Sequence, residues 1–345
     1  MRHPPLAPGW IDRPHLRVDI GDLPLESGAV LQDAFVTAVV HGDEARRGTA
    51  AILGLTAIGS THHRLDFLIG PGAALDSERF CIVVIDALGN GLSSSPSNST
   101  RQPGADFPAI TIRDMVESQR RALDAFGVDR LAAVVGASMG GMQALQWAVS
   151  HPLRMDRVVA MTPMARTARW SQLVNEMGRR ALFFDPACRM PRPRAEAMRL
   201  WVPLTQMVMA RTPEALEQLP SPVSLGDALD AAELELAEHG PDAFDWACQS
   251  RAYDGHDVGM TGGFGGETAQ ALASIDAEVL VVAAASDLYN PPFAGLEAAG
   301  GIRRSHVVRL PGVDGHRSAS GAGAASTAAL RDAVASFLRA EPGER

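Results

Sequence analysis

The residues around Ser138 have the types and spacing that a nucleophilic serine needs. An apolar run at residues 131–135 leads into Gly-Ala-Ser-Met-Gly at residues 136–140, and a helical pattern follows. A serine held in a tight turn between a strand and a helix needs small residues two positions away, which Gly136 and Gly140 supply. The turn would project the hydroxyl into a cleft and place the positive end of the helix dipole beneath a reacting carbonyl. The pattern indicates acyl transfer through a covalent ester on Ser138.

A serine hydroxyl at neutral pH needs a base, and the base needs a carboxylate that orients it. Two histidines lie near the C-terminus, His306 and His316. His306 begins the apolar run 306–310 and is expected to face solvent or a neighbour. His316 follows that run in a loop between glycine-rich segments, where groups at the carboxyl end of a parallel strand meet. We therefore expect His316 to be the base.

The orienting carboxylate is expected to be Asp287. It closes the apolar run 278–283 and precedes the turn-forming sequence Leu-Tyr-Asn-Pro-Pro. Asp276 lies at the wrong end of this run. Asp314, two residues before His316, is an alternative acid and could equally be a turn residue. The stretch between Asp287 and His316 is long enough for one helix and one strand.

The elements that position these groups are short apolar runs alternating with longer amphipathic segments. Runs without polar alternation are typical of parallel strands covered on both faces. The expected strands are residues 35–40, 51–55, 80–85, 131–135, 157–161, 278–283 and 306–310. Helices are expected from Thr111, with Asp114 completing a capping box, to about Phe126, from Ser138 to about Ser150, and from Ala324 to about Arg339. A strand–turn–helix serine followed by acid and histidine predicts the α/β-hydrolase fold, a doubly wound, mostly parallel sheet.

The alternation of strands and helices stops between residues 165 and 274. This stretch contains no convincing strand, reads as mainly helical and is too long for a loop, so it predicts an inserted lid. We divide the chain into an α/β core of residues 1–164 and 275–345 and a helical lid of residues 165–274. The lid is rich in Met and Trp and could support a homodimer. Residues 96–108 and 318–326 are expected to be loops.

Backbone N–H groups must stabilise the oxyanion that forms in acyl transfer. Met139 would supply one from the helix start, and Ala57 or Ile58, in the loop after residues 51–55, would supply the second. His62 and His63 follow this loop. Because no carboxylate or cysteine cluster adjoins them in the sequence, a pair lining the cleft mouth is favoured over a metal pair, and no metal is expected.

Composition excludes several classes of protein. The net charge is −9, every basic residue is an arginine, and the arginines are scattered, so no polybasic face for nucleic acid or anionic lipid is predicted. Three cysteines are too few for a disulfide scaffold. We find no signal-peptide core and no apolar stretch of about 18 residues, which predicts a cytoplasmic chain acting on small molecules.

Several segments together resemble the homoserine O-acetyltransferases and their esterase-like relatives. These are GASMGGMQALQWAVSHP at 136–152, LIGPGAALD at 68–76, NEMGRRALFFDP at 175–186, SDLYNPP at 286–292 and GH at 315–316. The resemblance covers roughly residues 47–186 and 278–317. It implies a catalytic triad of Ser138, Asp287 and His316 and a ping-pong reaction in which acetyl-CoA, as co-substrate, acylates the serine. It also implies that Arg179 binds a substrate carboxylate.

The sequence departs from the family pattern at two places. The family usually has Asp after the catalytic histidine, where it meets the amino group of homoserine, and Arg317 stands there instead. The segment GNGLSSSPSN at 89–98 resembles the hydrolase branch rather than the transferases. These departures favour a carboxylic ester hydrolase without a cofactor. An acyl-CoA-dependent O-acyltransferase acting on a small hydroxyl acceptor is the alternative, and a non-catalytic binding protein on this fold is the third.

Overall fold

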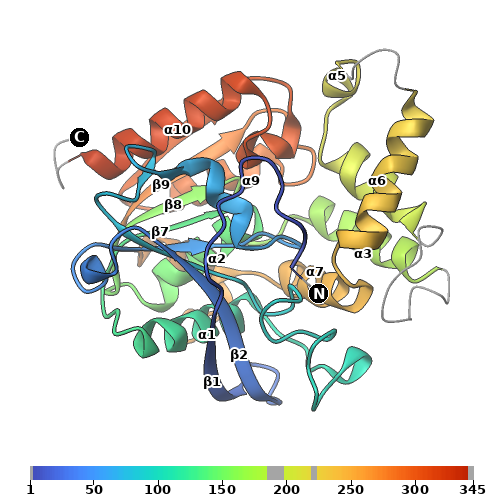
Figure 1. Ribbon diagram of the computed structural model, residues 1–345. Helices are drawn as coiled ribbons and strands as arrows, with labels where there is room; N and C mark the ends of the chain where they lie inside the picture. The colour runs from blue at the N-terminus through green and yellow to red at the C-terminus, as the bar shows by residue number, and fades with distance from the viewer. Residues whose placement is uncertain (1–2, 185–197, 219–223, 341–345) are drawn as a thin grey trace.

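An eight-stranded sheet forms the centre of the computed structural model, which describes residues 3–184, 198–218 and 224–340 (Figure 1). The strand order is β1-β2-β6-β3-β7-β8-β9-β10. The pairs β1–β2 and β2–β6 are antiparallel, and the pairs from β6 to β10 are parallel. The strands are β1 (Leu16–Pro24), β2 (Val30–His41), β3 (Ala51–Leu55), β6 (Cys81–Ile85), β7 (Leu131–Ala137), β8 (Met155–Met161), β9 (Glu278–Ala284) and β10 (Ser305–Leu310). The short strands β4 (Ile69–Gly70) and β5 (Leu75–Asp76) pair separately.

Helices cover both faces of the sheet, as the continuous apolar strands require. Side chains alternate between two buried clusters, so that Leu53 of β3 packs toward one face and Ile52 toward the other. One face is covered by α1 (Ile112–Ala125), α2 (Met139–Ser150), α8 (Thr268–Ala273) and α9 (Pro292–Gly301). The other face carries α10 (Ala324–Arg339) and the 3₁₀ segment η2 (His62–Leu68), and Figure 1 shows α10 and α1 on opposite sides.

The predicted α/β-hydrolase fold is confirmed, and the predicted strands appear within a few residues of their expected limits. The capping box of Thr111 and Asp114 is present with both of its hydrogen bonds. The edge strand β1 was missed, because its pairing with β2 is irregular around Gly21 and most of its side chains are exposed. The expected loop at 318–326 is wrong: the 3₁₀ segment η7 (Gly315–Ser320) and α10 leave only three residues between them.

Between β8 and α8 the regular elements of the described residues are helices, apart from an isolated bridge between Arg166 and Asp257. The elements are α3 (Arg169–Leu182), the π-helical η5 (Pro203–Met209), α5 (Pro213–Leu216), α6 (Leu225–His239), α7 (Ala243–Asp254) and η6 (Val258–Met260). A small apolar core joins α3, α6 and α7, and in it the rings of Trp201 and Trp246 meet edge to face at 5.3 Å. Gly178 of α3 allows this packing, since a Cβ there would lie 2.7 Å from the Trp246 ring.

Two further observations bear on the predictions from composition. In the described ranges, no helix combines the length and apolarity that crossing a bilayer requires. Cys81 is buried in the sheet as a free thiol, Cys248 is half-buried, and Cys188 lies outside the described residues. The homodimer through the lid stays a prediction.

Candidate active site at the end of strand β7

Ser138 occupies a strained turn between β7 and α2. Its φ of 58° and ψ of −122° lie in a region that residues with a side chain rarely adopt. The two glycines around it are required by close backbone contacts: a Cβ on Gly136 would lie 2.2 Å from the Gly140 carbonyl oxygen, and one on Gly140 would lie 2.6 Å from the Leu55 carbonyl oxygen. The local sequence therefore produces the sharp turn that presents the serine hydroxyl above the sheet.

The structure brings together the three residues that the sequence predicted to form a triad. His316 Nε2 lies 2.9 Å from Ser138 Oγ, and His316 Nδ1 lies 2.7 Å from Asp287 Oδ2. The other carboxylate oxygen, Oδ1, accepts the backbone N–H groups of Tyr289 and Asn290, each at 2.8 Å. Because a carboxylate only accepts hydrogen bonds, His316 carries its proton on Nδ1, and Nε2 is free to accept the proton of the serine hydroxyl.

The two alternatives left by the sequence are placed elsewhere. His306 Nε2 lies 2.8 Å from Glu278 Oε1, at the end of the sheet opposite Ser138. Asp314 is within hydrogen-bond distance of Ser326 Oγ, at 3.3 Å, and makes no bond to His316. Asp287 reaches His316, and Asp314 does not. Asp287 follows β9, whose carboxyl end lies beside the end of β10, the strand that precedes His316.

The predicted oxyanion donors lie at the same edge of the sheet. Met139 begins α2, so its N–H has no acceptor within the helix. Ala57 N–H donates to Ser60 Oγ at 2.8 Å, and Ser60 Oγ also lies 2.9 Å from the Ala57 carbonyl oxygen. Ile58 N–H makes no hydrogen bond within the part of the chain that the structure describes. A substrate oxygen could take the place of Ser60 Oγ on Ala57 or could bind Ile58.

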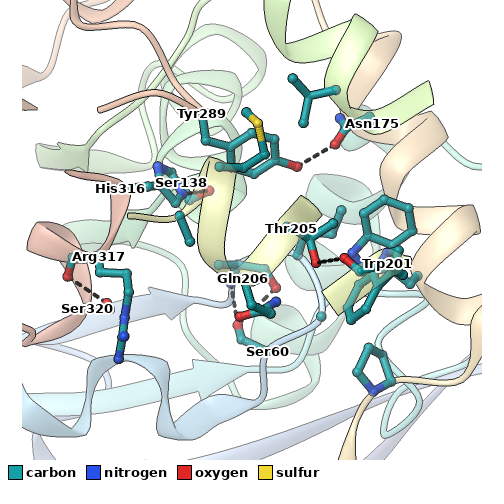
Figure 2. A pocket seen from close by; sticks show the side chains of 18 of the residues that line it. Ser60, Ser138, Asn175, Trp201, Thr205, Gln206, Tyr289, His316, Arg317 and Ser320 are labelled. Carbon is teal, nitrogen blue, oxygen red and sulfur yellow. Dashed lines mark hydrogen bonds between the residues drawn. The ribbon is translucent and has the colours of Figure 1, made fainter. Parts of the chain in front are cut away.

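A cavity of about 300 Å³ opens above Ser138 (Figure 2). Its floor is formed by the loop after β3 and by Ser138, His316 and Tyr289. Its roof comes from the helices between β8 and β9, with Val174, Trp201, Thr205, Gln206, Met209, Leu236 and Trp246 as lining residues. The roof is mainly apolar, which suits the hydrocarbon part of a small substrate.

Comparisons with known proteins place this site in a family. The family model described as "alpha/beta hydrolase fold" matches residues 59–314, about three quarters of the chain. The chain belongs to the α/β-hydrolase fold family. The prediction of an enzyme of the serine α/β-hydrolase type is thereby confirmed at the level of the family.

Individual relatives agree with the predicted resemblance. A homoserine O-succinyltransferase of Methylibium petroleiphilum is 36% identical over 182 residues, which are 48% of this chain and 47% of that protein. The chain thus aligns with about half the length of such relatives. The structure of the acetyl esterase MekB is 29% identical, with a TM-score of 0.85 over 95% of this chain and 97% of that one. A homoserine O-acetyltransferase from Bacillus anthracis has the same fold, with 21% identity and a TM-score of 0.82 over 95% and 98% of the two chains.

Arg179, predicted to bind a substrate carboxylate, forms ion pairs and a hydrogen bond with other side chains of this α/β-hydrolase. Its guanidinium lies 2.7 Å from Asp254 and 2.9 Å from Glu176, and it also donates to Ser250 Oγ. It is not among the residues that line the cavity above Ser138. Two carboxylates pair with Arg179 in this structure, so a direct contact with a substrate in the cavity stays a prediction.

Arg317 lines the cavity, together with Arg64 of η2. Neither guanidinium forms an ion pair with any described residue, and Arg64 Nε is buried without a hydrogen-bond partner there. Burial and the neighbouring Arg317 lower the pKa of Arg64 to about 10, so the Arg64 side chain stays positively charged at neutral pH. Two unpaired cations beside the cavity favour a negatively charged group on the substrate.

Sequence reasoning missed a polar network behind the triad. The Tyr289 ring meets the His316 ring edge to face at 5.0 Å, and its hydroxyl donates to Asn175 Oδ1. Asn175 Nδ2 in turn donates to Asp254 Oδ1 at 2.7 Å. Burial raises the pKa of Tyr289, so the phenol stays protonated and remains a donor. The signal was the sequence SDLYNPP, which places Tyr289 two residues after the acid, but only folding brings α3 beside it.

His62 and His63 differ from their predicted place at the cleft mouth. Both rings are buried, and each is bonded to a carboxylate: His62 Nδ1 lies 2.9 Å from Asp86 and His63 Nδ1 lies 2.6 Å from Asp66. The prediction that no carboxylate joins them was wrong because Asp86 follows β6, which is parallel to β3 and ends beside it. The sheet therefore brings an acid to the histidines from 24 residues away.

Proposed function

We propose that this α/β-hydrolase cleaves short-chain carboxylic esters through an acyl-enzyme on Ser138. The contact series Ser138–His316–Asp287, with both side-chain distances under 3.0 Å, carries this proposal. A hydroxyl, an imidazole and a carboxylate in this order provide a nucleophile, a base and an orienting group.

The chemical steps follow from the positions of these atoms. His316 Nε2 takes the proton of Ser138 as Oγ attacks the ester carbonyl, and Met139 N–H with a second amide from the β3 loop stabilises the oxyanion. His316 then gives that proton to the departing alcohol, which leaves the acyl group on Ser138. Water enters, loses a proton to Nε2 and attacks the acyl carbonyl, and the serine recovers its proton as the acid is released.

The size of the cavity supports a small acyl group. A volume of about 300 Å³ is at the lower end of the range for small-molecule sites. Trp201 and Trp246 pack against each other in the roof, so the cavity has little room to lengthen in that direction. The similarity to the acetyl esterase MekB across almost the whole chain agrees with an acetyl or similarly short acyl group.

The charge around the cavity supports an anionic substituent on the substrate. Arg64 and Arg317 would attract a carboxylate or phosphate and would repel an ammonium group. This argues against an amino acid whose ammonium group points toward η7. It is compatible with esters that carry an acidic group.

O-acyl transfer from an acyl-CoA to a hydroxyl acceptor is the second candidate. The observation in its favour is the 36% identity to homoserine O-succinyltransferases over about half of the chain. The same triad would serve both reactions, and the outcome depends on whether the roof excludes water while an alcohol is bound.

The two candidates are separated by supplying each with its own substrate. The purified chain is incubated with p-nitrophenyl acetate, with acetyl-CoA alone, and with acetyl-CoA plus a panel of hydroxy acids and alcohols. Turnover of the aryl ester without CoA release under any condition supports the esterase and excludes the transferase. CoA release that depends on an alcohol and is faster than ester hydrolysis supports the transferase and excludes the esterase. Turnover by Ser138→Ala at the wild-type rate would contradict both.

A further inference from the structure

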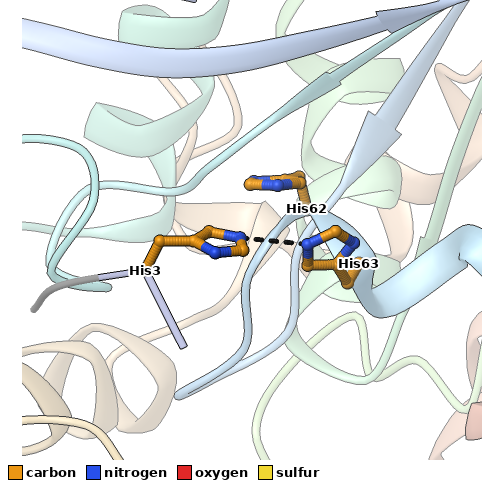
Figure 3. Close-up of side chains that lie close together, drawn as sticks. All are labelled: His3, His62 and His63. Carbon is orange, nitrogen blue, oxygen red and sulfur yellow. Dashed lines mark hydrogen bonds between the residues drawn. The ribbon is translucent and has the colours of Figure 1, made fainter. Parts of the chain in front are cut away.

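Three histidine side chains converge beside the loop that follows β3 (Figure 3). His62 and His63 belong to η2, and His3 reaches them from the N-terminal arm. One nitrogen from each ring lies within 4.8 Å of the others, and His3 Nε2 is 3.0 Å from His63 Nε2. A tetrahedral zinc ion with Zn–N bonds of about 2.0–2.1 Å separates its nitrogen ligands by about 3.3–3.4 Å, so no pair of nitrogens would need to approach by more than about 1.5 Å.

The partners of the Nδ1 atoms prepare two of these rings for a metal. Asp86 accepts a hydrogen bond from His62 Nδ1, and Asp66 accepts one from His63 Nδ1. With the proton on Nδ1, each Nε2 carries a lone pair directed away from the carboxylate. Carboxylates bonded to the far nitrogen are the usual support of histidine metal ligands, since they fix the tautomer and the ring orientation.

No hydrogen bond in the described structure accounts for the buried Nε2 of His62. It is buried and has no hydrogen-bond partner among the described residues. A buried nitrogen lone pair without a donor costs free energy, which a bound cation would recover. A fourth imidazole, His15, packs against His3 and His62 with ring centroids 4.5 and 4.6 Å away, but its nitrogens are not part of the mutually close set.

We propose that His3, His62 and His63 bind a zinc ion through three imidazole nitrogens. All three donors are neutral nitrogens, which suit Zn²⁺ better than Mg²⁺ or Ca²⁺. The ion would fasten the N-terminal arm to η2. Trp10 of the arm already stacks on His63 at 4.2 Å, and Asp66 accepts the backbone N–H of Ile11.

The location gives the ion a structural effect on the neighbouring cavity. His63 lines a second cavity of about 720 Å³, which offers a path for entry. Gly59, Ser60 and Arg64 line both this cavity and the one above Ser138. A metal on His62 and His63 would hold the loop that carries the second oxyanion donor. The zinc site does not depend on which acyl-transfer reaction the triad performs.

The amount of zinc bound per chain tests the proposal directly. The full chain is stripped with EDTA, loaded with excess Zn²⁺, desalted and analysed by mass spectrometry of the metal. We expect about one zinc per chain in the wild type and in His306→Ala, a histidine at the opposite end of the sheet that serves as the matched control. His62→Ala and His63→Ala should retain none, and His3→Ala should bind at least about 10-fold more weakly.

The zinc experiment can be interpreted even if the variants of the buried histidines do not fold. His3 is only half-buried on the arm, so His3→Ala decides if His62→Ala or His63→Ala fails to fold. Saturating zinc should raise the wild-type Tm by about 5 °C and raise the Tm of His3→Ala by less, because the variant binds more weakly. The cobalt form should show visible absorption without a thiolate band, which would appear if a cysteine were a ligand. A zinc-free wild type, a thiolate band, or equal zinc in the wild type and all histidine variants would overturn the proposal.

Discussion

The candidate active site and the cluster of His3, His62 and His63 both contain a carboxylate bonded to a histidine, but different groups face that histidine. In both, a buried carboxylate holds the Nδ1 of a buried histidine: Asp287 holds His316 at 2.7 Å, and Asp66 holds His63 at 2.6 Å. The difference lies at Nε2. His316 Nε2 faces the Ser138 hydroxyl, whereas His63 Nε2 faces His3 Nε2.

A carboxylate–histidine pair therefore has no function of its own. The carboxylate fixes the tautomer and leaves a lone pair on Nε2 in both places. Opposite a hydroxyl, that lone pair accepts a proton, and the strained turn at Ser138 supplies the hydroxyl. Opposite His3 the same lone pair faces another imidazole nitrogen instead of a hydroxyl, and burial together with its neighbours lowers the pKa of His3 to about 4. Such a set of neutral donors is suited to a cation.

The largest effect is expected from removing the hydroxyl that distinguishes the active site. Ser138→Ala should lower kcat for p-nitrophenyl acetate by at least about 10⁴-fold, since no nucleophile remains. The Tm should stay within a few degrees of the wild type. The control is Ser274→Ala at the end of α8, whose hydroxyl only bonds a backbone carbonyl. A kcat within 10-fold of the wild type would show that the hydroxyl opposite His316 is not the nucleophile.

Changing the carboxylate of the active site should have the next largest effect. Asp287→Asn should lower kcat by about 10³- to 10⁴-fold, because an amide can donate to Nδ1 and favour the wrong tautomer of His316. Asp276→Asn, at the opposite end of β9 and exposed, should change kcat less than 3-fold. If Asp314→Asn proved as damaging as Asp287→Asn, the alternative acid would regain support.

The matching change in the histidine cluster should leave catalysis nearly intact. Asp66→Asn should weaken zinc binding by about 10- to 100-fold, as losses of supporting carboxylates usually do, and change kcat less than 3-fold when zinc is saturating. Competition with a coloured chelator measures the affinity, and Asp156→Asn, an exposed carboxylate paired with Arg130, is the control. A large loss of kcat with unchanged zinc affinity would reverse the roles assigned to the two sites.

The smallest effect concerns the charge beside the cavity. Arg317→Ala should lower kcat/KM about 10-fold for a carboxylated ester and less than 3-fold for a neutral ester of the same length, because only the former loses a charge-assisted bond. Arg179→Ala should affect both esters equally, since that guanidinium binds Asp254 and Glu176. Equal effects of Arg317→Ala on the two esters would remove the proposed preference for anions.

Much of the fold and the active site could be predicted because they depend on local patterns. The glycines around Ser138 and the apolar runs of β3, β7 and β9 report directly on a strained turn and on buried parallel strands. The edge strand β1 was missed since its residues are largely exposed, and exposure weakens the apolar pattern. The pairing of Arg179 with Asp254 could not be predicted, because a sequence does not show which distant carboxylate will lie beside an arginine.

The sequence by itself determined which serine, histidine and carboxylate come together, because each lies where a parallel strand ends and such ends meet at one edge of the sheet. Only the tertiary structure decided which cations remain unpaired beside the cavity and which histidines share a site. Arg64 and Arg317 are 253 positions apart, and His3 is 60 positions from His63. Contacts over such separations arise from packing of whole elements, and no local pattern of residue types encodes them.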